Sequence, residues 1–171
     1  MTGSFDSVCS QETPTFLIAE LRLYPQFLSV IAAWFHSQRT LGGFVGTLEE
    51  CERKLAAQFG SDDIPVTYVT LVDGVAVGAA SFVYYEFTDK DVVRVPWLTN
   101  VFVEPKFRRL GLGNELVAFM EQRAVEMAHR KINLFTVDKR SFYQRRGWCF
   151  EYKARLSGSD VDVMSLGLGN A

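Results

Sequence analysis

The sequence predicts a single domain of mixed α/β class, in which a mostly antiparallel sheet of about seven strands is flanked by about four helices. The chain has 171 residues, of which 48% are hydrophobic and 22% charged. A chain of this length and hydrophobic fraction can form one hydrophobic core without disulfides or metals. Amphipathic helical patterns also alternate with apolar strand-like runs. We expect a flexible tail over residues 1–15 and one domain over 16–171.

The N-terminal part is predicted to contain an edge strand and two helices. Residues 16–23 alternate loosely between apolar and charged side chains, as an edge strand does. The apolar residues that follow recur at helical spacings: Phe27, Val30, Ile31, Trp34 and Phe35. After the loop at 41–46, Thr47 and Glu50 have the spacing of a capping box. The second helix is therefore expected to continue through 51–59.

Three strands are predicted in the middle of the chain. The runs 66–72 and 75–87 are separated by Asp73 and Gly74, a pair that tolerates the positive φ angles of a type I′ turn and so predicts a hairpin. A third run, 93–103, is almost wholly apolar. Such a run is typical of a strand buried on both faces, so we expect it near the centre of the sheet.

The second half of the chain predicts a long helix, a strand, a short helix and two closing strands. The long helix shows one apolar face: Leu112, Leu116, Met120, Ala124 and Met127. The remaining elements are expected at about 131–137, 139–146, 148–156 and 160–168. Helices would then cover the faces of one mixed sheet.

Charge and cysteine usage exclude several classes of protein. The formal net charge is only −2, which does not suggest a nucleic-acid binder. The three cysteines are far apart, with no Cys/His cluster that would hold a metal. They fit a reducing cytoplasm. No apolar run approaches the ~20 residues that would span a bilayer, so we expect no membrane association.

The most informative segment is 101–116, which reads VFVEPKFRRLGLGNEL. A strand leads into a loop with Arg108, Arg109, Gly111 and Gly113, and a helix begins inside the loop. The first amides of a helix lack intrahelical acceptors and, together with arginines and glycines, favour a diphosphate. The spacing matches neither a dinucleotide fingerprint nor a phosphate loop ending in GK[ST]. A glycine-rich helix start with solvated arginines would show the same spacing.

These residues resemble the GNAT N-acetyltransferase superfamily. Arg108, Gly111 and Gly113 fit its [R/Q]-x-x-G-x-[G/A] fingerprint, and FYQRRGW at 142–148 is similar to its F-Y-x-x-x-G-[F/W] signature. The likeness covers roughly residues 66–150. It implies a GNAT-like fold whose fourth and fifth strands splay apart. It also implies direct transfer of an acetyl group from acetyl-CoA to a primary amine in a ternary complex, with no metal.

The resemblance implies which residues bind the donor. Pantetheine would hydrogen-bond to the fourth strand, and the pyrophosphate would lie at the helix start. The residues expected to contact acetyl-CoA are Val101, Phe102, Val103, Arg108, Arg109, Leu110, Gly111, Leu112, Gly113, Asn114, Thr136 and Tyr143. Tyr143 matches the family tyrosine that follows the fifth strand, where a phenol would donate a proton to the leaving thiolate or position the thiol. A ring packed in the core is its structural alternative.

The base and the acceptor are less well defined by the sequence. Glu86 and Glu104 are the nearest carboxylates to the fourth strand, and a chain of waters without a single base is an equal alternative. The acceptor is expected to contact residues at the open end of the splay: Tyr84, Glu86, Trp97, Thr99 and Phe44. Aromatic walls favour a substrate with apolar surface.

Several alternatives stay open at this stage. The acceptor can be a small molecule or a peptide, and the acyl group can be longer than acetyl. A non-catalytic module that binds acyl-CoA as a regulator is the alternative function. A homodimer is possible.

Overall fold

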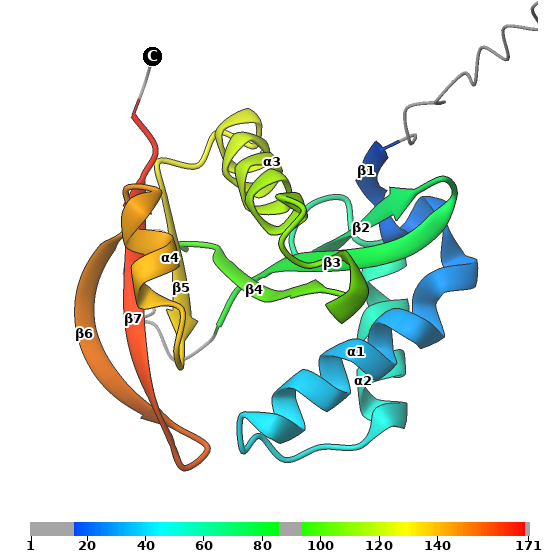
Figure 1. Ribbon diagram of the computed structural model, residues 1–171, viewed down its shortest axis with the longest axis horizontal. Helices are drawn as coiled ribbons and strands as arrows, with labels where there is room; N and C mark the ends of the chain where they lie inside the picture. The colour runs from blue at the N-terminus through cyan, green and yellow to red at the C-terminus, as the bar shows by residue number, and fades with distance from the viewer. Residues whose placement is uncertain (1–15, 86–93, 170–171) are drawn as a thin grey trace, which may run out of the picture.

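The computed structural model describes residues 16–85 and 94–169. Within these residues seven strands form one mixed sheet, in the order β1-β2-β3-β4-β5-β7-β6 (Figure 1). Their bounds are β1 (Phe16–Glu20), β2 (Val66–Val72), β3 (Val75–Val83), β4 (Trp97–Val103), β5 (Lys131–Thr136), β6 (Cys149–Leu156) and β7 (Ser159–Gly167). The β4–β5 pair is parallel and all other neighbours are antiparallel. The predicted mixed, mostly antiparallel sheet is confirmed.

Four α-helices cover the two faces of this sheet. They are α1 (Leu28–Leu41), α2 (Leu48–Ala57), α3 (Leu112–Glu126) and α4 (Arg140–Arg145), with short 3₁₀ turns η1 (Leu21–Leu23), η2 (Pro25–Phe27), η3 (Gln58–Gly60) and η4 (Pro105–Phe107). In Figure 1, α3 lies on one side of β2–β4 and α1 with α2 on the other. No helix in the described ranges is long and apolar enough to cross a bilayer.

Two hydrophobic clusters lie on the two faces of the sheet. The cluster beneath α3 and α4 includes Phe82, Leu116, Met120 and Trp148. The cluster beneath α1 and α2 includes buried apolar side chains such as Ile31. Strand alternation produces this division, because successive side chains of β2 and β3 point to opposite faces. Both faces of the central strands are therefore closed.

Local signals in the sequence correctly predict how two elements begin. The amide of Glu50 donates to Thr47 Oγ1 at 3.1 Å, and the amide of Thr47 donates to Glu50 Oε2 at 3.1 Å, which is the predicted capping box. The β2–β3 turn has φ of 50° at Asp73 and 77° at Gly74. Both angles fit a type I′ turn.

Some predicted boundaries are wrong. The strand expected over 16–23 ends at Glu20, because the chain turns there into η1 and buries Leu21. The strand expected over 75–87 ends at Val83, and residues 86–93 of the predicted strands lie outside the described ranges. The strand expected over 93–103 begins at Trp97. In the first helix, Val30 is 39% exposed rather than part of the apolar face.

Candidate active site

A bulge in β4 shapes the candidate site. Ala79 of β3 pairs with Phe102, but Ser81 pairs with Thr99, so β4 contains one extra residue between these pairs. Asn100 within the bulge has φ of 55°, in the left-handed region. Bulges bend the strand that carries them. This bend changes the direction of the backbone beyond Thr99.

Beyond the bulge, β4 and β5 diverge. The two strands share one registered pair, Trp97 with Asn133, and the Asn133 amide donates to the Pro96 carbonyl at 3.0 Å. In Figure 1, β4 and β5 run in different directions. The splay expected between the fourth and fifth strands is therefore confirmed.

The backbone of β4 presents hydrogen-bonding groups to this splay. The Glu104 amide donates to the Val77 carbonyl at 2.8 Å, which turns Glu104 toward β3. Alternation along the strand then turns the amides and carbonyls of Val101 and Val103 to the opposite side, away from β3. The Val101 carbonyl accepts from Gln38 Nε2 at 3.1 Å, and the Val103 carbonyl accepts from Arg108 Nε at 2.8 Å.

The helix α3 begins without a side-chain cap. Its N-cap residue Gly111 has φ of 83°, a left-handed conformation that glycine adopts readily. In the described part of the chain, the amides of Leu112, Gly113 and Asn114 have no hydrogen-bond acceptor. Unpaired amides and the positive end of the helix dipole together favour an anion at this position.

The start of α3 also has open space beside Gly113 and positively charged side chains nearby. A Cβ at Gly113 would meet a single atom within 4 Å, the Val103 Cγ2 at 4.0 Å, so the protein itself does not require glycine there. Arg109 is exposed and, among the described residues, has no ion-pair partner. Arg108 extends back along β4, with its guanidinium 5.7 Å from the Phe102 ring centroid. Leu110 is 68% exposed.

Tyr143 on α4 is buried beside the core and retains a free hydroxyl. Its ring contacts Phe142 and Trp148 edge to face, with centroids 5.0 and 5.7 Å away. No described residue forms a hydrogen bond to its hydroxyl group. Burial raises the pKa of Tyr143 to about 12, while Arg146 opposes and Glu121 adds to this increase. The phenol is therefore protonated throughout the neutral range.

Two other predicted residues, Thr136 and Glu104, contact neighbouring groups of the chain. Thr136, at the end of β5, accepts the Lys139 amide at 3.0 Å through Oγ1 and so supports the turn into α4. The Glu104 carboxylate lies 3.4 Å from Lys106 Nζ. Glu86 lies outside the described residues.

Three of the predicted acceptor residues lie together on the α1–α2 face. The register places Trp97 and Thr99 on that face, and the loop after α1 brings the Phe44 ring to 6.0 Å from Phe135 of β5. Phe135 and Tyr85 complete this aromatic group, with centroids 6.3 and 5.5 Å from Trp97. Trp97 is 2% exposed and can only support the other rings from behind.

Tyr84 does not join this aromatic group. It packs against the α3-side cluster, with its ring 6.4 Å from His129, and the Arg94 guanidinium lies 5.1 Å from its centroid. Desolvation raises the pKa of Tyr84, with Asp63 adding to the increase and Arg94 opposing it. Tyr84 and Tyr85 follow the end of β3, and their ring contacts, with His129 and Trp97 respectively, place them on opposite faces.

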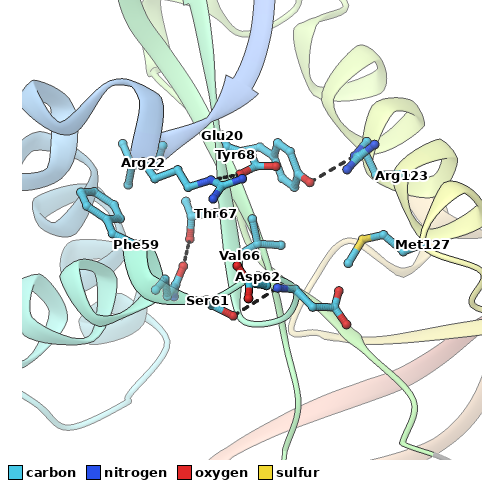
Figure 2. Close-up of a pocket in the computed structure, with 13 residues that line it drawn as sticks. Glu20, Arg22, Phe59, Ser61, Asp62, Val66, Thr67, Tyr68, Arg123 and Met127 are labelled. Atoms are coloured by element: carbon cyan, nitrogen blue, oxygen red, sulfur yellow. Dashed lines mark hydrogen bonds and ion pairs between the residues drawn. The ribbon is translucent and has the colours of Figure 1, made fainter.

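A pocket at the far end of α3 has a different character. It lies between η1, the start of β2 and the last turns of α3, and its lining includes Arg22, Tyr68 and Arg123. Figure 2 shows Arg22 paired with Glu20, and Arg123 Nε donating to the Tyr68 hydroxyl at 3.1 Å. None of the predicted site residues lines this pocket. In the described ranges, no three His, Cys, Asp or Glu side chains gather as metal ligands.

Sequence reasoning missed four residues near the site: Gln38, Tyr85, Glu121 and Phe135. Gln38 is a polar residue on an exposed helix face, which carries no signal by itself. Phe135 and Tyr85 could be found only from the register, because it decides which strand residues share a face with Trp97. Glu121 follows the helix start by two turns, and its role depends on contacts with α4.

The comparisons with known proteins agree with this geometry. Residues 29–148 match the acetyltransferase (GNAT) family. A GNAT acetyltransferase from Streptococcus pneumoniae is 21% identical, with 91% of this chain and 100% of that chain covered and a TM-score of 0.67. The Escherichia coli ribosomal-protein-S18-alanine N-acetyltransferase is 17% identical, with 92% and 96% covered and a TM-score of 0.65.

A putative acetyltransferase from Salmonella typhimurium, solved with its cofactor acetyl-CoA, is also similar. It is 16% identical, with 94% of this chain and 96% of that chain covered and a TM-score of 0.68. No curated protein matches the sequence. The family match spans well over half of the chain and includes β4, the α3 start and α4. The chain therefore belongs to the GNAT acetyltransferase family.

Proposed function

We propose that the chain is an N-acetyltransferase that moves the acetyl group of acetyl-CoA directly to a primary amine while both substrates are bound. The observation that carries this proposal is the start of α3, where three backbone amides lack an acceptor. They lie near the part of β4 that does not pair with β5. The amides suit a pyrophosphate and the strand edge suits the amide groups of a pantetheine arm. Family membership supports the same donor.

The residues around α3 fit CoA by shape and charge. The amides of Leu112, Gly113 and Asn114 would hold the pyrophosphate, and the missing Cβ at Gly113 lets it approach the backbone. Arg109 adds an exposed cation that no described carboxylate neutralises. Val101 and Val103 would bind pantetheine mainly through their amides, which face away from β3, because their carbonyls already accept from Gln38 and Arg108.

The transfer requires one bond to form and one to break. The neutral amine nitrogen attacks the thioester carbon, the carbon–sulfur bond breaks, and the sulfur leaves as a thiolate. A β4 amide beside the bulge would donate to the acyl oxygen as negative charge develops there. No described side chain near this edge is suited to remove the amine proton, because Trp97 and Thr99 are not bases and Glu104 faces Lys106. Water is the proposed acceptor of this proton, and Glu86→Gln tests the alternative.

Tyr143 is proposed to stabilise the leaving thiolate. With its pKa raised to about 12, the phenol keeps its proton, whereas an ordinary thiol has a pKa of about 8.5. Complete transfer of the proton from the phenol to the sulfur is therefore unfavourable. Donation of a hydrogen bond from the hydroxyl to the sulfur suits these values better.

The acceptor is proposed to be an amine attached to an aromatic or apolar group. Phe44, Tyr85 and Phe135 offer half-buried rings on the α1–α2 face, beside the point where β4 and β5 part. Gln38 is proposed to bind the amine group of the acceptor. Its Nε2 donates to the Val101 carbonyl, so its Oε1 is left to accept a hydrogen bond from the amine.

Two measurements test the proposal. Calorimetry with CoA should show binding without added metal, and no binding at millimolar CoA would refute the donor site. Thiol release from acetyl-CoA is then followed with phenethylamine, spermidine and a peptide that has one free α-amine. We expect phenethylamine to react fastest. Binding without turnover of any amine would instead support a non-catalytic acyl-CoA-binding module, and longer acyl-CoAs in the same assay test the acyl group.

A further inference from the structure

Glu121 of α3 accepts three hydrogen bonds from the segment that follows α4. Arg146 Nε and Trp148 Nε1 donate to Glu121 Oε1 at 3.2 and 2.8 Å, and Arg146 Nη2 donates to Oε2 at 2.7 Å. The Arg146 and Glu121 side chains are 18% and 19% exposed. Two parallel bonds to a half-buried carboxylate fix both position and orientation, unlike a mobile surface ion pair.

Arg146 and Trp148, which donate hydrogen bonds to Glu121, also contact Tyr143. The backbone amides of Arg146 and Trp148 donate to the Tyr143 carbonyl at 2.9 and 3.1 Å. The Trp148 ring contacts the Tyr143 ring at 5.7 Å, with an interplanar angle of 67°. Movement of either residue would therefore move the tyrosine.

Arg146 also reaches the first turn of α3. Its Nη1 lies 3.4 Å from Asn114 Oδ1, and Asn114 carries one of the amides without an acceptor. Asn114 and Glu121 are seven positions apart, which corresponds to about 10 Å along a helix. One guanidinium thus connects α4 to two positions on α3.

We propose that Glu121 is a positioning residue, which acts through Arg146 and Trp148 to hold the Tyr143 hydroxyl in a fixed place relative to the anion-binding start of α3. The donor is held at one end of α3 and must present its sulfur to a phenol on another helix. A misplacement of about 1 Å costs large factors in rate, so a rigid link between these helices has catalytic value. The kinetic part of this inference rests on the proposed function.

The same helix supplies a matched control. Glu126 pairs with Arg123 three residues earlier, but these side chains are 45% and 33% exposed, and neither contacts α4 in the described structure. Glu126→Gln therefore removes one α3 carboxylate and one arginine contact without affecting Tyr143.

A double-mutant cycle tests the link to Tyr143. Glu121→Gln keeps the shape but loses the paired, charge-assisted bonds, so we expect kcat to fall about tenfold with the KM for acetyl-CoA changed less than about threefold. In a Tyr143→Phe background the same change should cost less than about twofold, because the hydroxyl that it positions is absent. Equal costs in the two backgrounds, or a loss no larger than that of Glu126→Gln, would overturn the proposal.

A titration of Tyr143 tests the network without any turnover. The charged groups that face this phenol are Arg146 and Glu121. Removing the Glu121 charge leaves Arg146 unopposed, so the pKa of Tyr143 should fall. Phenolate absorbance of Tyr143 is obtained by subtracting the absorbance of the same protein with Tyr143→Phe added, for both the wild type and Glu121→Gln. An unchanged pKa in Glu121→Gln contradicts the proposal even if no amine is ever acetylated.

Two further measurements separate positioning from simple loss of folding. If Glu121→Gln proves unstable in a thermal melt, Glu121→Asp keeps the charge on a shorter side chain and should give a smaller loss of kcat with a smaller shift of the Tyr143 pKa. CoA affinity by calorimetry reports on the donor site separately. A wild-type chain that binds CoA but acetylates no amine would refute the proposed function, while the titration would still decide on Glu121.

Discussion

The two ends of α3 differ in whether the chain itself satisfies their backbone hydrogen-bonding groups. At the C-terminus, Ala128 adopts φ of 61°, its amide donates to the Val125 carbonyl at 2.9 Å, and the His129 amide donates to the Ala124 carbonyl at 3.0 Å. This is a Schellman closure, in which the chain itself satisfies the last carbonyls. At the N-terminus, the amides of three successive residues have no acceptor within the described chain.

Polar side chains near each end show the same contrast. In the pocket by the last turns, Arg22 pairs with Glu20 and Arg123 donates to the Tyr68 hydroxyl (Figure 2). Arg109 near the first turn is exposed and pairs with no described carboxylate. The backbone groups at the end of α3 are therefore satisfied within the chain, whereas those at its start are left for a charged ligand. The open end, rather than the pocket at the other end, is the better candidate for function.

The largest expected effect comes from filling the open end. Gly113→Val places a branched side chain where the diphosphate would approach, and its Cβ would meet the protein only at 4.0 Å. Loss of two charge-assisted bonds of about 1.5–3 kcal/mol each predicts a fall in CoA affinity of about 100-fold or more. The melting temperature should change little. Calorimetry and a thermal melt measure both quantities.

Arg109→Ala is the matched change of charge at the same end. Because Arg109 is exposed, its loss should weaken CoA binding less than Gly113→Val does. The opposite ranking would show that arginine side chains, not the backbone of the helix start, hold the diphosphate.

The next effect concerns turnover. Tyr143→Phe removes one hydroxyl and keeps the packed ring, so CoA affinity should persist while kcat falls by up to about 10²-fold. KM should change little, because the hydrogen bond to sulfur strengthens only as charge develops. If Tyr143 serves packing alone, steady-state kinetics of this variant will match the wild type.

The same variant predicts a pH dependence of stability. The folded-state pKa of Tyr143 is about 12, above the ordinary value of 10.0, so the folded chain holds the phenolic proton more tightly. The contribution is fully present below pH 10 and is lost as pH rises toward 12, by about 3 kcal/mol in total. Denaturant unfolding of wild type and Tyr143→Phe between pH 8 and 11 should show the wild type losing more stability. Parallel curves would contradict the raised pKa.

The sequence predicted the elements of the fold better than the arrangement of the site. Periodicity and the Asp73–Gly74 turn depend on neighbouring residues, and the structure bears them out. The position of the start of α3 was likewise predicted, because the loop before it contains glycines and arginines, and anion binding there stays a prediction. The resemblance to a known family predicted the splay, whose physical origin is the bulge at Asn100.

Features that depend on distant contacts could not be predicted in this way. Tyr84 was grouped with Trp97, yet the adjacent Tyr85 contacts the Trp97 ring, while Tyr84 contacts His129. Glu121 bonds Arg146 and Trp148, which are 25 and 27 positions away in the chain. No local pattern encodes such a pairing.

A smaller effect is expected at the closed end. Ala128 adopts a left-handed conformation that costs an L-residue about 1 kcal/mol, which Ala128→Gly should recover in part. We expect slightly greater resistance to denaturant and unchanged CoA affinity. A change in CoA affinity would show that the two ends of α3 are coupled, contrary to the separation described above.

The smallest effect is expected from Glu104→Gln, which tests whether the carboxylate that follows β4 takes part in the chemistry. Glu104 lies in the connection between β4 and η4, where its side chain is 29% exposed and pairs with Lys106, which is 68% exposed. Such pairs contribute about 0–1 kcal/mol, so stability and kcat should stay within about twofold of the wild type. A general base would behave differently, because its loss lowers the rate by about 10²-fold or more and removes its ionisation from the pH profile. Initial rates from pH 6 to 9 distinguish these outcomes, and a large loss would make Glu104, rather than water, the group that takes the amine proton.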